Sequence, residues 1–253
     1  MTFGSTSAFS RTASDYAATV APALVPVASE VVRRASLRPG ESVLDVGTGT
    51  GTGARLAVGE GRRIIGLDGA EGMLEIARQE VPEAEFIEAD FTQIPLDDAS
   101  VDVLLAVHAL LFAGDRVAAL TEWLRVTAPR GRISLSAPGP GNVAPSAVLG
   151  SVYDRYDIEW HATDYPDTVE LAGWAQDAGW TDVATDADPT TGIRLADENA
   201  FRTWLRVARF STDWSPERID AFARDLMAAS PRGADGSFRL PFGAQYLTAR
   251  RPA

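Results

Sequence analysis

The chain has 253 residues, of which 45% are hydrophobic and 23% are charged, a composition typical of one globular domain rather than of a disordered segment. Acidic residues outnumber basic ones by 35 to 23, and the net charge of −12 argues against a nucleic-acid partner, because a phosphate backbone would be repelled. The sequence contains no cysteine and only two histidines, which excludes disulfides and thiolate chemistry and leaves little for a metal centre.

No stretch of the sequence reaches the roughly 18 consecutive apolar residues of a membrane span. Residues 1–20 also lack the charged-then-apolar order of a signal peptide. We therefore expect a cytoplasmic protein that has no membrane partner. The length fits a single domain over residues 1–253, and both a monomer and a homodimer remain open.

Apolar residues recur at helical spacing from residue 16 to residue 35. Pro22 and Pro26 would each break or start a helix, so residues 1–40 are expected to form one or two leading helices. Short apolar runs then alternate five times with helix-forming segments, and these runs begin at residues 42, 63, 85, 101 and 132. The alternation predicts βαβ units and a doubly wound sheet in an α/β fold, with residues 41–138 as its core.

After residue 138 the alternation stops. Residues 146–165 are aromatic and show no clear period, so we expect an irregular segment there. Further along the chain we expect helices at 167–180, 198–210 and 216–229, and strands at 180–186 and 237–251. The last helix has Ser215 as its N-cap and Pro216 at its first position. Residues 139–166 and 196–233 are predicted to be cap or lid insertions.

Gly47, Gly49 and Gly51 alternate directly after the first apolar run. Glycines at a tight strand-to-helix turn let backbone amides approach a ligand closely, so this turn is a candidate cofactor cradle. The pattern alone leaves three interpretations open. It fits a dinucleotide loop followed about twenty residues later by a ribose-binding acid, Asp68. It also fits the loop of a different cofactor, or a turn that binds no ligand.

An acid, Asp45, precedes the first glycine, and the resulting LDVGTGTG resembles the first motif of the class I S-adenosylmethionine-dependent methyltransferases, in their small-molecule branch (methyltransferase type 11, UbiE-like). GLDGAEGMLEIAR resembles the second motif of this family, EADFTQIPLDDASVDVLLAVHALL the third and fourth, and LRVTAPRGRISLS the entry to a later strand. Together the motifs cover residues 42–137. The resemblance implies a Rossmann-like fold with a mostly parallel sheet of seven strands and helical cap insertions. Asp45 is expected to organise the turn.

The same resemblance implies S-adenosylmethionine as the cofactor, S-adenosylhomocysteine as the product and a small-molecule methyl acceptor. Residues 47–49 would face the methionine part of the cofactor, Asp68 would accept both ribose hydroxyls, and Asp90 would hold the adenine amino group. Met73 and Phe91 would enclose the adenine ring, unless they serve only as core residues. The cofactor-binding candidates are Asp45, Gly47, Thr48, Gly49, Gly51, Asp68, Gly69, Met73, Asp90, Phe91 and Ala106.

Methyl transfer from a sulfonium is an in-line displacement, so alignment and exclusion of water matter more than a metal, and we expect no metal site. A general base is optional. His108, at the end of the fourth apolar run, is the catalytic candidate, with a place in the cavity wall as the alternative. Related natural-product enzymes often carry histidines where this chain has Leu111 and Phe112, which counts against base catalysis.

Aromatic residues concentrate after residue 150, where the family usually has insertions that cover the acceptor. Such residues would suit a flat, apolar or aromatic acceptor, although packing between cap helices explains them equally well. The lid candidates are Tyr16, Tyr153, Tyr156, Trp160, His161 and Trp204. Two alternative functions remain. One is an NAD(P)-dependent oxidoreductase, which would lack a Tyr-x-x-x-Lys pair because the chain has no lysine. The other is a protein that keeps the cofactor fold without transferring methyl groups.

Overall fold

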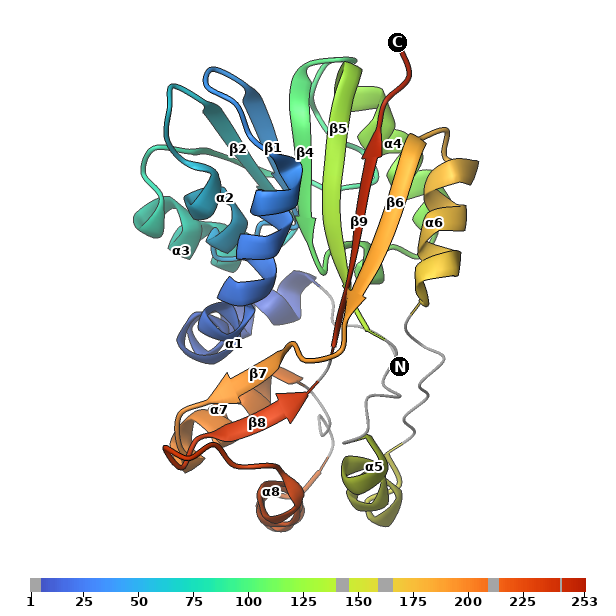
Figure 1. The fold of residues 1–253 in the computed structure, drawn as a ribbon. Coiled ribbons are helices and arrows are strands. Elements are labelled where there is room, and N and C mark those ends of the chain that lie inside the picture. Colours follow the sequence, from blue (N-terminus) through green and yellow to red (C-terminus); the bar gives the residue numbers. More distant parts are fainter. Residues whose placement is uncertain (1–5, 140–145, 159–165, 209–213, 242) are drawn as a thin grey trace.

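The computed structural model describes residues 6–139, 146–158, 166–208, 214–241 and 243–253. The strands of its main sheet are β1 (Ser42–Val46), β2 (Arg63–Asp68), β3 (Glu85–Glu88), β4 (Val101–Val107), β5 (Thr127–Pro138), β6 (Thr181–Asp188) and β9 (Ala244–Arg250). Their order is β3-β2-β1-β4-β5-β9-β6 (Figure 1). Strands β1 to β5 pair in parallel, and β9 runs antiparallel to both of its neighbours. The expected doubly wound, mostly parallel sheet of seven strands is confirmed.

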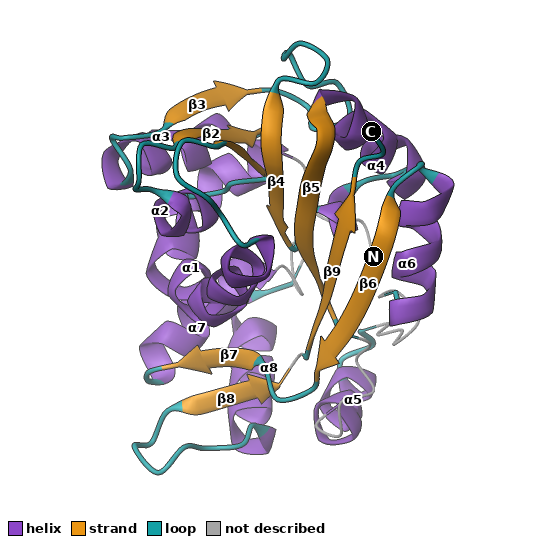
Figure 2. Ribbon diagram, turned by 45° about the horizontal axis from the view of Figure 1, so that its top comes forward, coloured by secondary structure: helices purple, strands orange, loops and turns teal. Residues whose placement is uncertain are grey.

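Alternating side chains of the buried strands divide the core between the two faces of this sheet. The surrounding helices are α1 (Thr6–Ala35), α2 (Thr52–Ala57), α3 (Glu71–Glu80), η1 (Leu110–Phe112), α4 (Arg116–Val126) and α6 (Thr168–Asp177). Val43 packs on the face covered by α1 and α2, whereas the next residue, Leu44, faces α4 and α6. Figure 2 shows helices on both sides of the sheet. Because both faces are covered, the central strands are apolar throughout.

Of the two expectations for the leading segment, one helix or two, the structure has one. Pro22 and Pro26 lie inside α1 and are exposed to solvent. Proline removes a helical amide donor, and on the exposed side the carbonyl group left without that donor can bond to water. Val27 and Val31 stay buried against the sheet, and Figure 1 shows that α1 changes direction between its first and last parts.

A second group of elements, here called the cap, lies below the main sheet in Figure 1, where β4 and β6 end. The cap consists of α5 (Ser146–Arg155), β7 (Gly192–Leu195), α7 (Glu198–Ala208), α8 (Pro216–Ala229) and β8 (Phe238–Pro241). β7 and β8 form a separate antiparallel sheet, which adds to the expected helices. Phe201, Phe222 and Phe238 are buried in a hydrophobic cluster that belongs to the cap alone apart from a contact with α1.

The expectation of an irregular segment over residues 146–165 was wrong for residues 146–155, and residues 159–165 lie outside the described residues. Val152, Tyr153 and Tyr156 pack on the cap cluster, and their spacing puts them on one face of a helix. Contacts of these side chains with Phe222 of α8 fix that face, as the ring centroids of Tyr153 and Phe222 lie 6.2 Å apart. Tertiary packing therefore makes α5 a helix although the sequence shows no clear period.

The expectation of one closing strand was also wrong. The segment divides into β8, which belongs to the cap, and β9, which belongs to the main sheet. Pro241 has no amide hydrogen to continue the ladder, and Gly243 has a φ of 60°, which turns the backbone. The two halves of one apolar pattern thus pair with different partners.

Several local predictions are confirmed. α6, α7, α8 and β6 lie where helices and a strand were expected, and the Ser215 hydroxyl accepts a hydrogen bond from the Arg218 amide at 3.3 Å, as an N-cap should. None of the helices in the described ranges combines the length and apolarity that crossing a membrane requires. Within the same ranges, no three His, Asp or Glu side chains gather closely enough to hold a metal ion.

Candidate active site

The glycine turn joins β1 to α2. Gly47 and Gly49 have φ values of 65° and 55°, in the left-handed region that favours glycine. Asp45, at 1% exposure, supports the turn from the sheet side: its Oδ2 accepts hydrogen bonds from the Thr48 hydroxyl at 2.7 Å and from the Ala54 amide at 2.8 Å. Asp45 therefore organises the turn, as expected.

The two glycines are needed for different reasons. A Cβ on Gly47 would lie 2.5 Å from the Cβ of Ala109, which is closer than real side chains approach. A Cβ on Gly49 would point toward the ring of Tyr16, 3.9 Å from its Cε1. Gly47 thus permits close packing of the turn, and Gly49 leaves the space beside Tyr16 open to a ligand.

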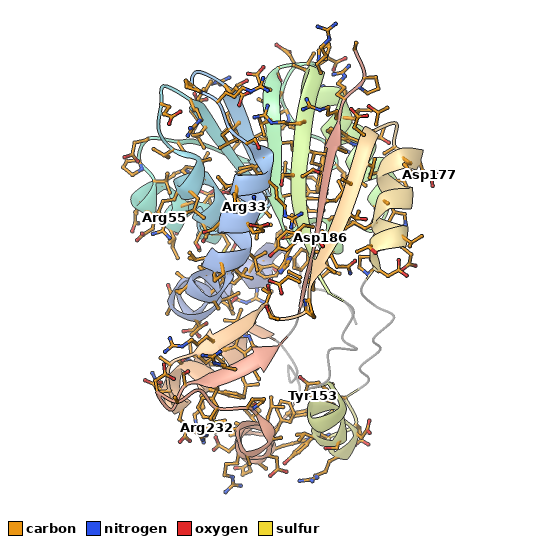
Figure 3. The ribbon with its side chains drawn as sticks, viewed as in Figure 1. Arg33, Arg55, Tyr153, Asp177, Asp186 and Arg232 are labelled. Atoms are coloured by element: carbon orange, nitrogen blue, oxygen red, sulfur yellow. The ribbon has the colours of Figure 1, made fainter. Side chains whose placement is uncertain are left out.

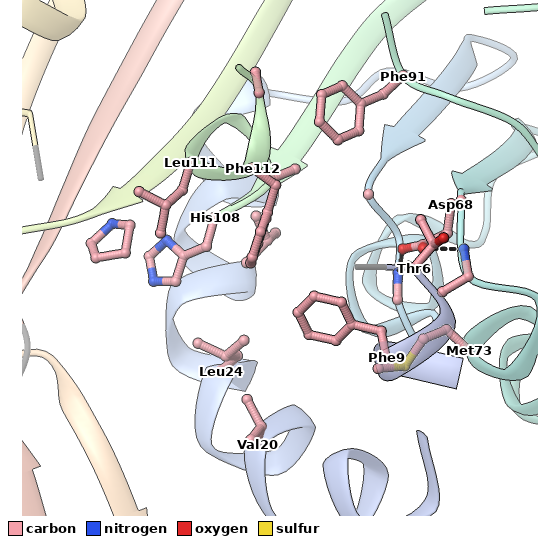
Figure 4. A pocket seen from close by; sticks show the side chains of 18 of the residues that line it. Thr6, Phe9, Val20, Leu24, Asp68, Met73, Phe91, His108, Leu111 and Phe112 are labelled. Carbon is pink, nitrogen blue, oxygen red and sulfur yellow. Dashed lines mark hydrogen bonds between the residues drawn. The ribbon is translucent and has the colours of Figure 1, made fainter. Parts of the chain in front are cut away.

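Asp68 ends β2 and lies beside the turn. Its Oδ2 accepts the Gly49 amide at 2.8 Å and its Oδ1 accepts the Ala70 amide at 2.9 Å, so both oxygens are oriented (Figure 4). Each oxygen keeps a lone pair for a further donor. Burial raises the pKa of Asp68, and the backbone hydrogen bonds oppose that rise. Burial likewise raises the pKa of Asp45, to about 6, against its own hydrogen bonds.

The turn and Asp68 open into one cavity of about 1050 Å³. Pockets for one drug-sized ligand commonly measure ~300–1,000 Å³, so this cavity has room for two small molecules side by side. One part, here called the glycine half, is lined by Gly47, Gly49, Asp68, Met73, Asp90 and Phe91. The other part, here called the apolar half, is lined by Val20, Leu24, Val27, His108, Leu111 and Ile193. Figure 4 shows Asp68 and Met73 on one side of the view and His108, Leu24 and Leu111 on the other.

Comparison with known proteins assigns the family. A family model described as "Methyltransferase domain" matches residues 44–135. The malonyl-[acyl-carrier protein] O-methyltransferase of Serratia marcescens is 36% identical over 159 residues, which span 63% of this chain but only 61% of that protein. The demethylmenaquinone methyltransferase of Beutenbergia cavernae is 31% identical over 173 residues, which span 60% of this chain and 72% of that protein. This chain belongs to the class I S-adenosylmethionine-dependent methyltransferases.

The fold of this methyltransferase agrees with solved structures. The phosphoethanolamine N-methyltransferase 2 of Haemonchus contortus, solved in complex with S-adenosylmethionine, matches with a TM-score of 0.60 at 16% identity, over 90% of this chain and 53% of that chain. The resemblance read from the motifs is confirmed. The alternative of an NAD(P)-dependent oxidoreductase is not favoured, because the family match includes the glycine turn itself.

Most of the cofactor-binding candidates of the methyltransferase come together in the glycine half. Those that line the cavity are Gly47, Gly49, Asp68, Gly69, Met73, Asp90 and Phe91. Met73 is buried against Phe9 and Tyr16 of α1. Phe91 packs edge-on against Trp123, with ring centroids 6.1 Å apart, and its other side remains at the cavity. Both residues therefore combine core packing with a place in the cavity wall.

The remaining candidates lie beneath the cavity rather than on its surface. Thr48 turns its hydroxyl toward Asp45. Gly51 faces α3, where a Cβ would lie 3.1 Å from Cγ2 of Val81. Ala106 is fully buried in β4. Asp45, Thr48, Gly51 and Ala106 thus lie behind the cavity wall, and none of them is among the residues that line the cavity.

The lid candidates separate into two groups. Tyr16 lines the cavity, and burial together with the nearby Asp68 carboxylate raises its pKa, so its hydroxyl stays protonated. Tyr153, Tyr156 and Trp204 instead pack in the cap cluster, where aromatic rings bury one another; Figure 3 places Tyr153 on α5, at the base of the molecule. They do not line the described cavity. Trp160 and His161 lie outside the described residues.

His108 follows β4 with a φ of 57°, a conformation uncommon for histidine. Its amide donates to the Ser136 carbonyl at 3.1 Å, and its Nδ1 lies 3.1 Å from the Ser136 hydroxyl. Burial lowers the pKa of the imidazole to about 4, so the ring is neutral near pH 7. A group with such a pKa accepts protons weakly, which favours a role in recognition over general base catalysis.

Sequence reasoning expected helices in residues 1–40 and named Tyr16 there, but it did not find that the start of α1 closes the glycine half. Thr6 and Phe9 line the cavity there. Two glycines allow this approach: a Cβ on Gly69 would lie 2.9 Å from Cγ2 of Thr6, and a Cβ on Gly72 would lie 2.6 Å from the carbonyl oxygen of Ser10. Gly72 was an available signal, because it lies among the helix-forming residues after the second apolar run, where a glycine commonly has a packing reason.

Proposed function

We propose that this protein transfers a methyl group from S-adenosylmethionine to a small, apolar or aromatic acceptor. The supporting observation is that one continuous cavity joins a glycine turn and an oriented acid to an apolar chamber. S-adenosylmethionine supplies an electrophilic methyl group on its sulfonium. The apolar half would hold the acceptor next to that methyl group and keep water away, which is what an in-line displacement needs most.

The residues of the glycine half suit an adenosyl ligand. Asp68 would accept both ribose hydroxyls with the lone pairs that the amides of Gly49 and Ala70 leave available. Met73 and Phe91 would enclose the adenine ring. The amides of the turn from Gly47 to Gly49 would bind the methionine part, Asp90 would accept from the adenine amino group, and the protonated Tyr16 would act as a hydrogen-bond donor beside the turn.

The acceptor is proposed from the walls of the cavity. The names of the two relatives state malonyl-[acyl-carrier protein] and demethylmenaquinone as acceptors. A quinone suits the apolar half better than an acyl group that ends in a carboxylate, because the described lining offers no cation to pair with it. The net charge of −12 favours a small molecule over a nucleic acid.

Calorimetry with S-adenosylmethionine, S-adenosylhomocysteine and NAD tests the cofactor. We expect the first two to bind and NAD not to bind. Asp68→Ala should weaken both interactions by more than about tenfold, because hydrogen bonds to a charged acceptor are each worth ~1.5–3 kcal/mol. Asp97→Ala, at an exposed loop acid, is the matched control and should keep the affinity.

Binding of NAD without a response to the other two ligands would end this proposal. Unchanged affinity in Asp68→Ala would show that the ribose binds elsewhere. Methyl transfer itself is followed as S-adenosylhomocysteine formed in the presence of hydroxylated aromatic acceptors, and no turnover with any of them in a protein that binds the cofactor would favour a binding protein without methyl transfer.

A further inference from the structure

The charged side chains that line the described cavity are all acidic. They are Asp68, Glu88, Asp90 and Asp115. The chain contains no lysine, and no arginine of the described ranges reaches the lining. An anion that entered this cavity would lose hydration without gaining an opposite charge from the protein. The lining therefore offers the carboxylate or phosphate of an acceptor no oppositely charged side chain.

His108 brings a polar atom to the otherwise apolar chamber. Its Nδ1 is engaged by the Ser136 hydroxyl at 3.1 Å, whereas its Nε2 has no hydrogen-bond partner within the described residues and is not sealed in the core. Leu24 and Leu111 line the same part of the cavity, and Figure 4 shows both on the side of His108. Thr191 also lines the cavity, but its hydroxyl already donates to the Asp188 carboxylate at 2.8 Å.

The direction of the His108 ring is fixed by the backbone. The residue is held with a φ of 57° at the end of β4, where its amide bonds to the Ser136 carbonyl at 3.1 Å. The Ser136 side chain is fully buried, and its hydroxyl lies 3.1 Å from Nδ1, which holds the ring by that nitrogen. Burial also keeps the pKa of the ring near 4, so near pH 7 it brings no positive charge that would offset an anion.

We propose that the acceptor is an uncharged, largely apolar molecule whose hydroxyl group hydrogen-bonds to Nε2 of His108, with Ser136 as the positioning residue. This inference rests on the proposed function, because it specifies the acceptor of the same cavity. A hydroxyl both donates and accepts hydrogen bonds, so it fits either neutral tautomer of the ring. A carboxylate only accepts, and the described lining of the cavity offers it no cationic side chain.

Two probes separate charge from shape, since 2-naphthol and 2-naphthoate share their rings and differ in the polar group. Both are titrated by calorimetry into wild-type protein saturated with sinefungin, an unreactive amine analogue of S-adenosylmethionine that keeps its positive charge. Near pH 7 we expect 2-naphthol to bind at least about tenfold more tightly than 2-naphthoate.

Substitutions in the chamber test the two parts of the inference. Leu24→Arg places a cation in the apolar half and should reverse the order, so that 2-naphthoate binds about tenfold more tightly than 2-naphthol. Leu24→Met is the matched uncharged control and should keep the wild-type preference. His108→Phe keeps an aromatic wall without Nε2 and should weaken 2-naphthol about tenfold, with sinefungin affinity unchanged.

Nitrogen resonances of the ring report the contact directly. The chain has two histidines, so labelling with ¹⁵N-histidine gives few signals, and His161→Gln assigns the second ring. 2-Naphthol should shift the Nε2 resonance of His108. Ser136→Ala should shift the Nδ1 resonance and weaken 2-naphthol while sinefungin still binds, which a general loss of structure would not produce.

Three results would overturn this inference: 2-naphthoate bound by the wild type as tightly as 2-naphthol or more tightly, an Nε2 resonance that 2-naphthol leaves in place, or no change of preference in Leu24→Arg. Failure of the wild type to bind sinefungin counts against the proposed function instead, so the two failures are distinguishable.

Discussion

The two halves of the cavity are assembled in different ways. Most of the glycine half comes from one stretch of sequence, residues 47–91, in which consecutive strands end at the same edge of the sheet, and the start of α1 closes it. The apolar half combines Leu24 of α1, His108 after β4 and Ile193 of the cap, which are far apart in the chain. A motif can record only what is local, so the sequence reveals the glycine half, whereas the apolar half arises from folding. A substitution in one half should therefore weaken binding in that half and leave binding in the other half unchanged.

The largest effect is expected from the cap. Phe201 is fully buried, with ring centroids 4.8 Å from Phe238 and 5.6 Å from Trp204. Phe201→Ala should lower the free energy of unfolding by ~3–5 kcal/mol, measured by denaturant titration. Because β7 carries Ile193 into the apolar half, 2-naphthol affinity should fall more than about tenfold, with S-adenosylmethionine affinity changed by less than about threefold.

Val169→Ala is the control for this variant, because Val169 is 75% exposed and touches neither half. A parallel loss of both affinities in Phe201→Ala would show that the cap supports the whole cavity, and the comparison between the two halves would then fail.

The next effect concerns the glycine half. A Cβ on Gly72 would lie 2.6 Å from the Ser10 carbonyl oxygen, so Gly72→Ala must push the start of α1, with Phe9, away from the cavity. Overpacking of this kind costs ~1–3 kcal/mol, and calorimetry should show S-adenosylmethionine bound about tenfold more weakly. Gly173→Ala, in open space on α6, should leave binding unchanged. Equal affinities in the two variants would remove α1 from the cofactor site.

A smaller effect is expected from Asp45, beneath the glycine turn. Because burial holds its pKa near 6, above the ordinary value of 3.8, the native protein keeps this proton where the unfolded chain has lost it. Its contribution to stability is greatest below about pH 4 and is lost as pH rises through about 6. In thermal unfolding, the wild-type Tm should fall relative to that of Asp45→Asn across this window and run parallel above it.

His108, in the apolar half, should give the opposite sign. Burial lowers its pKa from 6.5 to about 4, so the native ring stays neutral where the unfolded chain is protonated. The wild-type Tm should therefore fall relative to that of His108→Phe as pH decreases through about 6.5 toward about 4. If the difference in Tm between the wild type and either variant did not depend on pH, the substituted group would titrate normally in the folded protein.

Much of the fold was predictable because its signals are local. Apolar runs located β1 to β4. Two acids were recognisable by their positions, Asp45 within β1 and Asp68 at the end of β2. The cap was harder, because a ring's direction depends on its partners. Tyr153 and Trp204 suggested a lid from composition, yet they face Phe222 and Phe201 in the interior of the cap. No local pattern distinguishes these two environments.

The dependence on distant partners also explains the other differences between the predicted and the observed structure. The apolar pattern from residue 237 to residue 251 continues across Pro241, and only pairing with β7 on one side and with β5 and β6 on the other divides it. The role of Gly72 depends on the backbone of Ser10, which lies in a different helix. Contacts of this kind form between distant segments when the main sheet brings the helices together, so no local sequence pattern predicts them.

A crystal structure of the wild-type protein grown with S-adenosylhomocysteine and 2-naphthol is the most direct measurement. The account predicts ribose hydroxyls on the Asp68 carboxylate, the sulfur where the glycine half meets the apolar half, and the naphthol oxygen against Nε2 of His108. An adenosyl group bound away from Asp68 and the glycine turn would contradict it.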